Sequence, residues 1–260
     1  MIIVAFAMAC VVYADNIAVK PSDVITNIGN DITLPCQLAE GVTNEYVSWY
    51  EFNTKENGFQ IFKSYQPDIV QNSEKFVVDT TEAKYNLNVI NISFEDAGKY
   101  TCQTFQEQQR YPAYVTVYET PSCDNTRTSR ESITLMCKIR YAGVAKPTLQ
   151  WFRNGKETYT NVSVAYNTSS KDAHIATTNV TFDVSYEDIG ANFMCRVSST
   201  DHPEYVGDSC TSTPNWNDNE IKATYRVSAT EPSIRDRNIF LISMLASLNV
   251  MVVGCGLADH

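Results

Sequence analysis

The chain has 260 residues, of which 30 are acidic and 20 are basic, so its formal net charge at pH 7 is −10. No cluster of Lys or Arg interrupts this negative balance, which argues against nucleic acid and against anionic lipid surfaces as partners. Once the apolar segments at both ends are set aside, the remaining length suits two domains of about 100 residues each.

Residues 1–14 form a short apolar run that ends Val12-Tyr13-Ala14, with small side chains at the two positions that a signal peptidase reads. This pattern predicts a cleaved signal peptide and an oxidising compartment, in which six cysteines remain for disulfides. Four Asn-x-Ser/Thr sequons agree with a secretory route. They predict glycans on Asn91, Asn161, Asn167 and Asn179. The last three sequons imply that one face of the second domain carries a glycan cover.

Residues 15–118 contain short segments of alternating polarity separated by turn residues, which is typical of the strands of a β-sandwich. Trp49 follows Cys36 by thirteen residues and shares the inward face of its strand with Val47. The indole is therefore expected to pack in the core, where its large area contributes strongly to stability.

The first domain also contains the segment Asp96-Ala97-Gly98-Lys99-Tyr100-Thr101-Cys102. Tyr100, two residues before the cysteine, is placed to send its hydroxyl back to the upstream backbone. Asp96 is expected to pair with Lys75, although a solvated carboxylate is the alternative because surface pairs contribute little.

Residues 119–212 repeat the pattern, with Trp151 fourteen residues after Cys137 and with Cys195 later in the chain. Phe193 takes the position that Tyr100 has in the first domain and carries no hydroxyl, so packing must hold this corner. The short connection at 119–122 contains Pro121, which predicts a semi-rigid pair of domains.

A polar stalk and spacer is expected at 213–238, followed by a hydrophobic tail at 239–260. The tail has no charge from Ile239 to Ala258, which is long enough to cross a bilayer as a helix. Small residues at 228–230, a polar spacer and an apolar end form the order of a GPI signal, with Ser228 as the attachment site. A single transmembrane helix is the alternative, but the flank of Lys or Arg that such a helix carries is missing.

The combination of Cys, Trp and Asp-Ala-Gly-x-Tyr-x-Cys resembles the immunoglobulin superfamily, and the resemblance covers nearly the whole secreted chain. It implies an all-β fold of two tandem immunoglobulin-like β-sandwiches, the first of V or I type and the second of C2 or I type. It further implies the disulfides Cys36–Cys102 and Cys137–Cys195, with Trp49, Trp151 and Tyr100 in the two cores.

Two further cysteines, Cys123 and Cys210, lie near the beginning and the end of the second domain. The first and last strands of such a sandwich run side by side, so these two are expected to pair with each other. Pairing with another molecule is the alternative.

The sequence offers no set of residues for catalysis. His174 and His202 are the only histidines between the two apolar ends, and neither has a second ligand at the spacing of a metal site. The sequence contains no nucleophile elbow, no phosphate-binding glycine loop and no Cys-x-x-Cys motif. We therefore predict no enzyme activity, no metal and no cofactor.

The resemblance implies a cell-surface recognition or adhesion protein whose first domain binds an extracellular or cell-surface protein. The loop expected at 106–112 and the outward side of the neighbouring strands combine aromatic side chains with an Arg, types enriched where binding energy concentrates. The candidate partner-binding residues are Tyr50, Phe105, Arg110, Tyr111 and Tyr114. The alternative is a soluble or shed immune-type protein that captures foreign ligands. Whether binding is homophilic or heterophilic stays open.

Overall fold

The computed structural model describes residues 16–214 except 44, 53–58, 65–72, 107, 130–131, 159–162 and 169–172. The predicted signal peptide, the sequon at Asn161, the attachment site at Ser228, the stalk beyond residue 214 and the apolar tail at 239–260 lie outside the described residues. Among the described residues no helix has the length and apolar character needed to cross a membrane.

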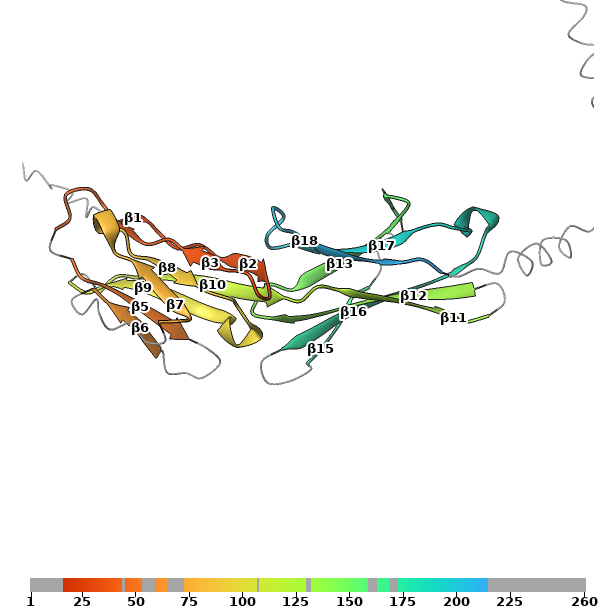
Figure 1. Ribbon diagram of the computed structural model, residues 1–260, viewed down its shortest axis with the longest axis horizontal. Coiled ribbons are helices and arrows are strands. Elements are labelled where there is room, and N and C mark those ends of the chain that lie inside the picture. Colours follow the sequence, from red (N-terminus) through yellow and green to blue (C-terminus); the bar gives the residue numbers. More distant parts are fainter. Residues whose placement is uncertain are drawn as a thin grey trace, which may run out of the picture.

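The first domain is a sandwich of two sheets, at the red-to-yellow end of the molecule in Figure 1. One sheet has the strand order β3 (Ile32–Leu34), β8 (Asn86–Val89) and β7 (Phe76–Asp79). The other has the order β2 (Val24–Asn27), β10 (Arg110–Tyr118), β9 (Gly98–Thr104), β5 (Val47–Phe52) and β6 (Phe59–Lys63). A short pair, β1 (Ile17–Val19) with β4 (Gln37–Leu38), completes the domain. β10 thus begins at Arg110, inside the loop expected at 106–112.

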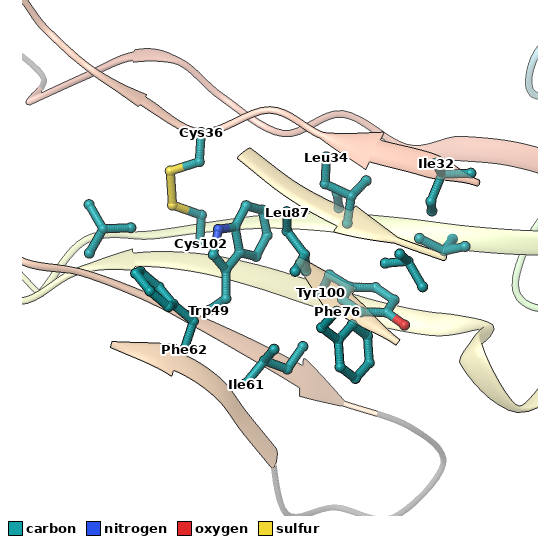
Figure 2. Close-up of a cluster of buried hydrophobic side chains, with 14 of the residues drawn as sticks. Ile32, Leu34, Cys36, Trp49, Ile61, Phe62, Phe76, Leu87, Tyr100 and Cys102 are labelled. Carbon is teal, nitrogen blue, oxygen red and sulfur yellow. A yellow bond between two sulfur atoms is a disulfide. The ribbon is translucent and has the colours of Figure 1, made fainter. Parts of the chain in front are cut away.

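The core of the first domain forms around the Cys36–Cys102 disulfide and Trp49, whose side chain is fully buried. Figure 2 shows the indole beside the disulfide, with Leu87 and Phe62 close by. The indole Nε1 donates to the carbonyl oxygen of Tyr85 at 2.6 Å, so the polar atom of this large side chain is satisfied inside the core.

The turn that leads into β9 contains the predicted contacts of Tyr100 and Asp96. The buried Tyr100 hydroxyl donates to the carbonyl oxygen of Asp96 at 2.9 Å, and Lys75 Nζ lies 2.7 Å from Asp96 Oδ2. Asp96 Oδ2 also accepts the backbone N–H of Ser93, which closes a capping box around the short 3₁₀ helix η2 (Phe94–Asp96). The predicted Asp96–Lys75 pair is confirmed, and the carboxylate also fixes the turn into β9.

The second domain is also a sandwich. One sheet has the order β11 (Ser122–Arg127), β12 (Ser132–Ala142), β16 (His174–Asp183) and β15 (Ala165–Thr168). The facing sheet has the order β14 (Lys156–Glu157), β13 (Pro147–Arg153), β17 (Phe193–Ser199) and β18 (Val206–Ser212). Besides these strands, the described residues contain only short 3₁₀ turns: η1 (Thr81–Ala83), η2 and η3 (Tyr186–Asp188). The predicted all-β class with two sandwiches is confirmed.

Two disulfides, Cys137–Cys195 and Cys123–Cys210, join the sheets of the second domain. Cys123 lies opposite Cys137 across β11 and β12, and Cys195 lies opposite Cys210 across β17 and β18, so the two bridges are neighbours. At the corner without a hydroxyl, the ring of Phe193 is fully buried and lies 5.3 Å from that of Phe182. Packing of two aromatic rings thus takes the place of the hydrogen bond of Tyr100.

The two domains join through continuous sheet structure. The end of β10 pairs with the end of β12, with Val117 opposite Ala142 and Tyr118 opposite Tyr141. The strands follow one another along the long axis of the molecule in Figure 1. The connection is therefore a hydrogen-bonded ladder in addition to the covalent linker.

Tyr118 lies at the centre of this junction. Its side chain is fully buried and belongs to the core of the second domain, where its ring meets those of Tyr141 at 6.2 Å and Tyr205 at 5.3 Å. Its hydroxyl donates to the carbonyl oxygen of Ala145 at 3.1 Å. The last residue of the first domain thus completes the core of the second.

The close approach of the two domains depends on Gly143, whose φ is +110°. A Cβ at this position would lie 2.8 Å from both Thr116 Cα and the carbonyl oxygen of Val115. Glycine is therefore required both by the backbone conformation and by the space available.

Candidate functional site

The outward side of the β5–β9–β10 sheet in the first domain carries aromatic and basic side chains. Trp49 and Cys102 point into the core, so the residues that alternate with them point outward. Phe52 on β5 lies opposite Lys99 on β9, and Lys99 lies opposite Tyr114 on β10. We call the outward residues Tyr50, Phe52, Lys99, Arg110 and Tyr114 the aromatic face.

Local contacts hold three side chains of the aromatic face, Tyr50, Phe52 and Lys99, in place. Gln60 Nε2 donates to the hydroxyl of Tyr50 at 3.0 Å, and the rings of Tyr50 and Phe52 lie 6.5 Å apart. Lys99 Nζ lies 5.5 Å from the ring centre of Phe52, a cation–π contact. These side chains are half-buried, so binding would cost less rotamer entropy than binding by unrestrained chains.

Larger neighbouring side chains cover the outward-pointing residue at the centre of this sheet. Thr101 lies between Tyr50 and Pro112 in the register and is only 3% exposed, although its strand position points outward. The surface offered to a partner therefore consists of the larger flanking side chains, with Tyr114 36% exposed at the β10 side.

A second group of aromatic side chains lies at the free end of the first domain. Tyr46 is 45% exposed and Phe105 is 60% exposed, and their rings meet edge to face with centres 6.4 Å apart. The backbone N–H of Phe105 donates to the carbonyl oxygen of Tyr46 at 2.8 Å. We call this pair the aromatic tip.

A buried carboxylate organises the aromatic tip. Glu45 is 6% exposed, and its Oε1 accepts the backbone N–H groups of Gln106 at 2.7 Å and Tyr46 at 3.2 Å. Its Oε2 accepts Nδ2 of Asn16 at 3.2 Å. One side chain thus ties together the N-terminal segment and the two loops that hold the aromatic pair.

Tyr111 lies away from the other candidate residues. It is opposite Cys102 in the register and packs half-buried against the core, on the opposite side of the sheet from Tyr50. Its hydroxyl donates to Gln109 Oε1, and Lys20 Nζ lies 5.0 Å from its ring centre. The cause is the earlier start of β10: residues 110–112 follow strand alternation instead of lying in a loop. Pro112 is tolerated there because β2 does not pair with β10 before Val115, so its missing N–H breaks no ladder.

The structure thus divides the five candidates among three places. Tyr50, Arg110 and Tyr114 lie on the aromatic face, Phe105 lies on the aromatic tip, and Tyr111 lies behind the sheet. Phe52 lies two residues after the outward Tyr50, and Lys99 directly precedes the inward Tyr100. Strand alternation in the sequence could therefore have identified both as outward residues. Glu45 reads in the sequence as an ordinary loop carboxylate, and no pattern distinguishes it from a solvated one.

Two of the sequons lie on one face of the second domain. Asn179 is opposite Met136, and Asn167 is opposite Ile175, on the outward side of the β12–β16–β15 sheet. Both asparagines are exposed, and the alternate positions Ala176 and Val180 are buried. Glycans on both would cover the same face.

The sequon at Asn91 lies on the first domain, just after β8 ends. Asn91 has a φ of 48° and is exposed. Its backbone N–H donates to Asp31 Oδ1 at 2.8 Å. Strand alternation would point Asn91 inward, like Leu87 and Val89, but the chain turns after Val89 and this side chain is exposed.

Two titratable groups with a shifted pKa, Glu51 and Tyr100, lie opposite each other on β5 and β9. Burial raises the pKa of the Glu51 carboxyl, and burial beside Glu51 raises the pKa of Tyr100 well above its usual range. The Tyr100 hydroxyl donates to Glu51 Oε1 at 3.2 Å, which opposes part of the effect on Glu51. Tyr100 is fully buried and Glu51 is half-buried, so this arrangement contributes to the stability of the fold.

The described residues do not bring potential metal ligands together in a usable form. The sulfur atoms of Cys123, Cys137 and Cys210 lie within 4.8 Å of one another, but all three are bound in disulfides. His174 packs 5.3 Å from the ring of Tyr141, and His202 Nδ1 lies 3.1 Å from Glu204 Oε1. The two histidines thus have separate surroundings.

Comparisons with known proteins agree with this architecture. Two family models, both described as immunoglobulin domain, match residues 16–104 and 126–207. The chain is also similar to the V-set and immunoglobulin domain-containing protein 1 of Gallus gallus, at 22% identity over 194 residues. That match covers 68% of this chain and 58% of the relative, so the chain spans somewhat more than half of that protein.

Proposed function

We propose that this chain, which belongs to the immunoglobulin superfamily, acts in recognition or adhesion at the cell surface by binding a protein through its first domain. The observation that carries the proposal is the aromatic face. Tyr50, Phe52 and Tyr114 lie together on one sheet with Lys99 and Arg110, and this composition is enriched at the energetic centres of protein interfaces.

The glycan positions support the choice of the first domain. Glycans on Asn167 and Asn179 would shield one sheet of the second domain, whereas the sequon of the first domain, at Asn91, follows β8 in the other sheet of that sandwich. The aromatic face would therefore stay accessible on a glycosylated molecule.

The three disulfides and the immunoglobulin domains support an extracellular location. We further propose that a GPI anchor on Ser228 attaches the chain to the membrane. Cells that display the chain should release it after treatment with a phosphatidylinositol-specific phospholipase C. Retention of the chain after this treatment would favour a spanning helix, and secretion without any treatment would favour the soluble binder.

The aromatic face is tested by the double variant Tyr50→Ala/Tyr114→Ala in a screen of the displayed chain against a panel of cell types. Each truncation of an interface aromatic is expected to cost more than about 1 kcal/mol, so the double variant should bind at least about tenfold more weakly. Tyr186→Ala is the matched control, because Tyr186 is 61% exposed on the second domain. Unchanged binding by a folded double variant would remove the aromatic face from consideration.

A further inference from the structure

We infer that the aromatic face binds a different protein that presents acidic side chains, and not a second copy of this chain. The inference rests on the proposed function, since it specifies the partner of the same face. It follows from the sign and the arrangement of the charges around the aromatic residues.

The described part of the aromatic face is basic in an acidic protein. The chain has a net charge of −10, yet Lys99 and Arg110 occupy outward positions of β9 and β10. Lys63 on β6 lies opposite Ser48, in the row that leads through Gln103 to Arg110. The face therefore has the opposite sign to the molecule as a whole.

The two central cations are not neutralised within the described residues. Arg110 is exposed and has no hydrogen bond or ion pair there. Lys99 contacts the ring of Phe52, a contact that leaves its charge uncompensated. Asp23 precedes β2, and its Oδ1 accepts the backbone N–H of Tyr114 at 2.8 Å. The cations are thus available to carboxylates of a partner.

Pairing of two copies through this face is unfavourable. A two-fold dimer places the same patch on both sides of the interface, so a positive patch would face a positive patch. Like charges that face each other in an interface weaken the association. The aromatic side chains alone would have to offset this repulsion.

Pairing of the face with an acidic surface elsewhere on a second copy would be a head-to-tail contact. Such a contact builds a ring of copies where the rotation between them closes and an open filament where it does not, so it does not give a pair. A different protein with carboxylates around an apolar centre satisfies the aromatic face in a single contact. Arg110 suits such a partner because its guanidinium can bind a carboxylate through two hydrogen bonds.

A charge-reversed version of the chain supplies a probe of this chemistry. The variant Lys99→Glu/Arg110→Glu keeps Tyr50, Phe52 and Tyr114 but presents carboxylates beside them. Cells that display the full chain are mixed with cells that display this variant, and mixed aggregates are counted by two-colour flow cytometry. Surface staining for the folded chain confirms equal display.

We expect wild-type cells to aggregate with variant cells, and neither population to aggregate by itself. The mixed aggregates should fall at least about tenfold in number when the salt concentration shortens the Debye length from about 8 Å toward about 3 Å. The matched control Lys138→Glu/Lys156→Glu makes the same charge change at exposed positions of the second domain and should give no mixed aggregates. Aggregation of wild-type cells that Tyr50→Ala/Tyr114→Ala abolishes would overturn the inference, as would the absence of mixed aggregates.

The panel of cell types separates this inference from the proposed function. Binding to the panel that is lost in both the aromatic and the charge-reversed variants supports both. Binding that is lost only in the aromatic variant leaves the proposed function standing and refutes the acidic partner. Binding that neither variant changes refutes both.

Discussion

Truncation of Tyr118 to Ala should destabilise the second domain, although the residue belongs to a strand of the first. The substitution removes a fully buried ring from the packing with Tyr141 and Tyr205 and removes the hydrogen bond to Ala145. It leaves the backbone of β10 and its pairing with β9 unchanged, because that pairing extends from Arg110 to Val115.

The magnitude follows from burial. Truncation of a buried aromatic side chain to Ala costs about 3–5 kcal/mol, because the cavity that remains fills only in part. The variant Tyr118→Phe keeps the ring and loses only the hydrogen bond to the Ala145 carbonyl oxygen, which is worth about 1 kcal/mol. The difference between the two variants isolates the contribution of the ring at the junction.

Native-state hydrogen exchange measured by mass spectrometry resolves the two domains. In Tyr118→Ala, amides of β13 and β17 should exchange at least about 100-fold faster, the factor that corresponds to 3 kcal/mol, whereas amides of β5 and β9 should change much less. Tyr118→Phe should fall between this variant and the wild type. Wild-type protection of β13 and β17 in Tyr118→Ala would refute the view that this side chain completes the second core.

Three further predictions concern buried or clustered groups. Burial raises the pKa of Glu51 above that of the unfolded chain, so the folded state binds this proton more tightly and the free energy of unfolding falls as pH rises above about 4.5. The variant Glu51→Gln should remove this part of the pH dependence of urea unfolding. An unchanged pH profile would contradict the assignment. The half-buried Cys123–Cys210 bridge should open before the buried Cys137–Cys195 bridge under mild reduction. Because the bridge closes a loop of 87 residues, its opening should lower the free energy of unfolding by up to about 4 to 5 kcal/mol. Peptide mapping after alkylation that finds Cys137 or Cys195 labelled first would reject this order. Glu45→Ala leaves the backbone N–H groups of Tyr46 and Gln106 without their acceptor and should lower the free energy of unfolding by about 2 kcal/mol. Backbone NMR relaxation should show increased motion at residues 104–106. Unchanged relaxation at these residues would show that the carboxylate does not hold the aromatic tip.

Alternation and the spacing of the cysteines were enough to predict the two sandwiches. Trp49 and Trp151 are fixed by their position relative to the preceding cysteine, and both are buried as expected. The contact of Asp96 with Lys75 was also predictable, since the same segment carries Tyr100 two residues before Cys102. These features depend on local spacing, which the sequence displays directly.

The junction between the domains was not predictable in this detail. The sequence indicates a short connection, but the pairing of Tyr118 with Tyr141 depends on how two separate sheets meet. The placement of Tyr111 failed for a related reason, because the start of β10 is decided by its pairing with β9 and not by the Pro at 112. The carboxylate of Glu45 is identified only by donors that come from distant parts of the chain.

The joined ends of β10 and β12 determine how force would pass through the molecule under the proposed function, in which one end is anchored and the other is bound. A pull along the long axis would try to slide these strands past each other, and it would load the ladder at Val117–Ala142 and Tyr118–Tyr141 together with the linker. Resistance to such a pull depends on the rate of unfolding under load rather than on equilibrium stability alone. The pairing of β10 with β12 would transmit tension from one domain to the other without first extending a flexible linker.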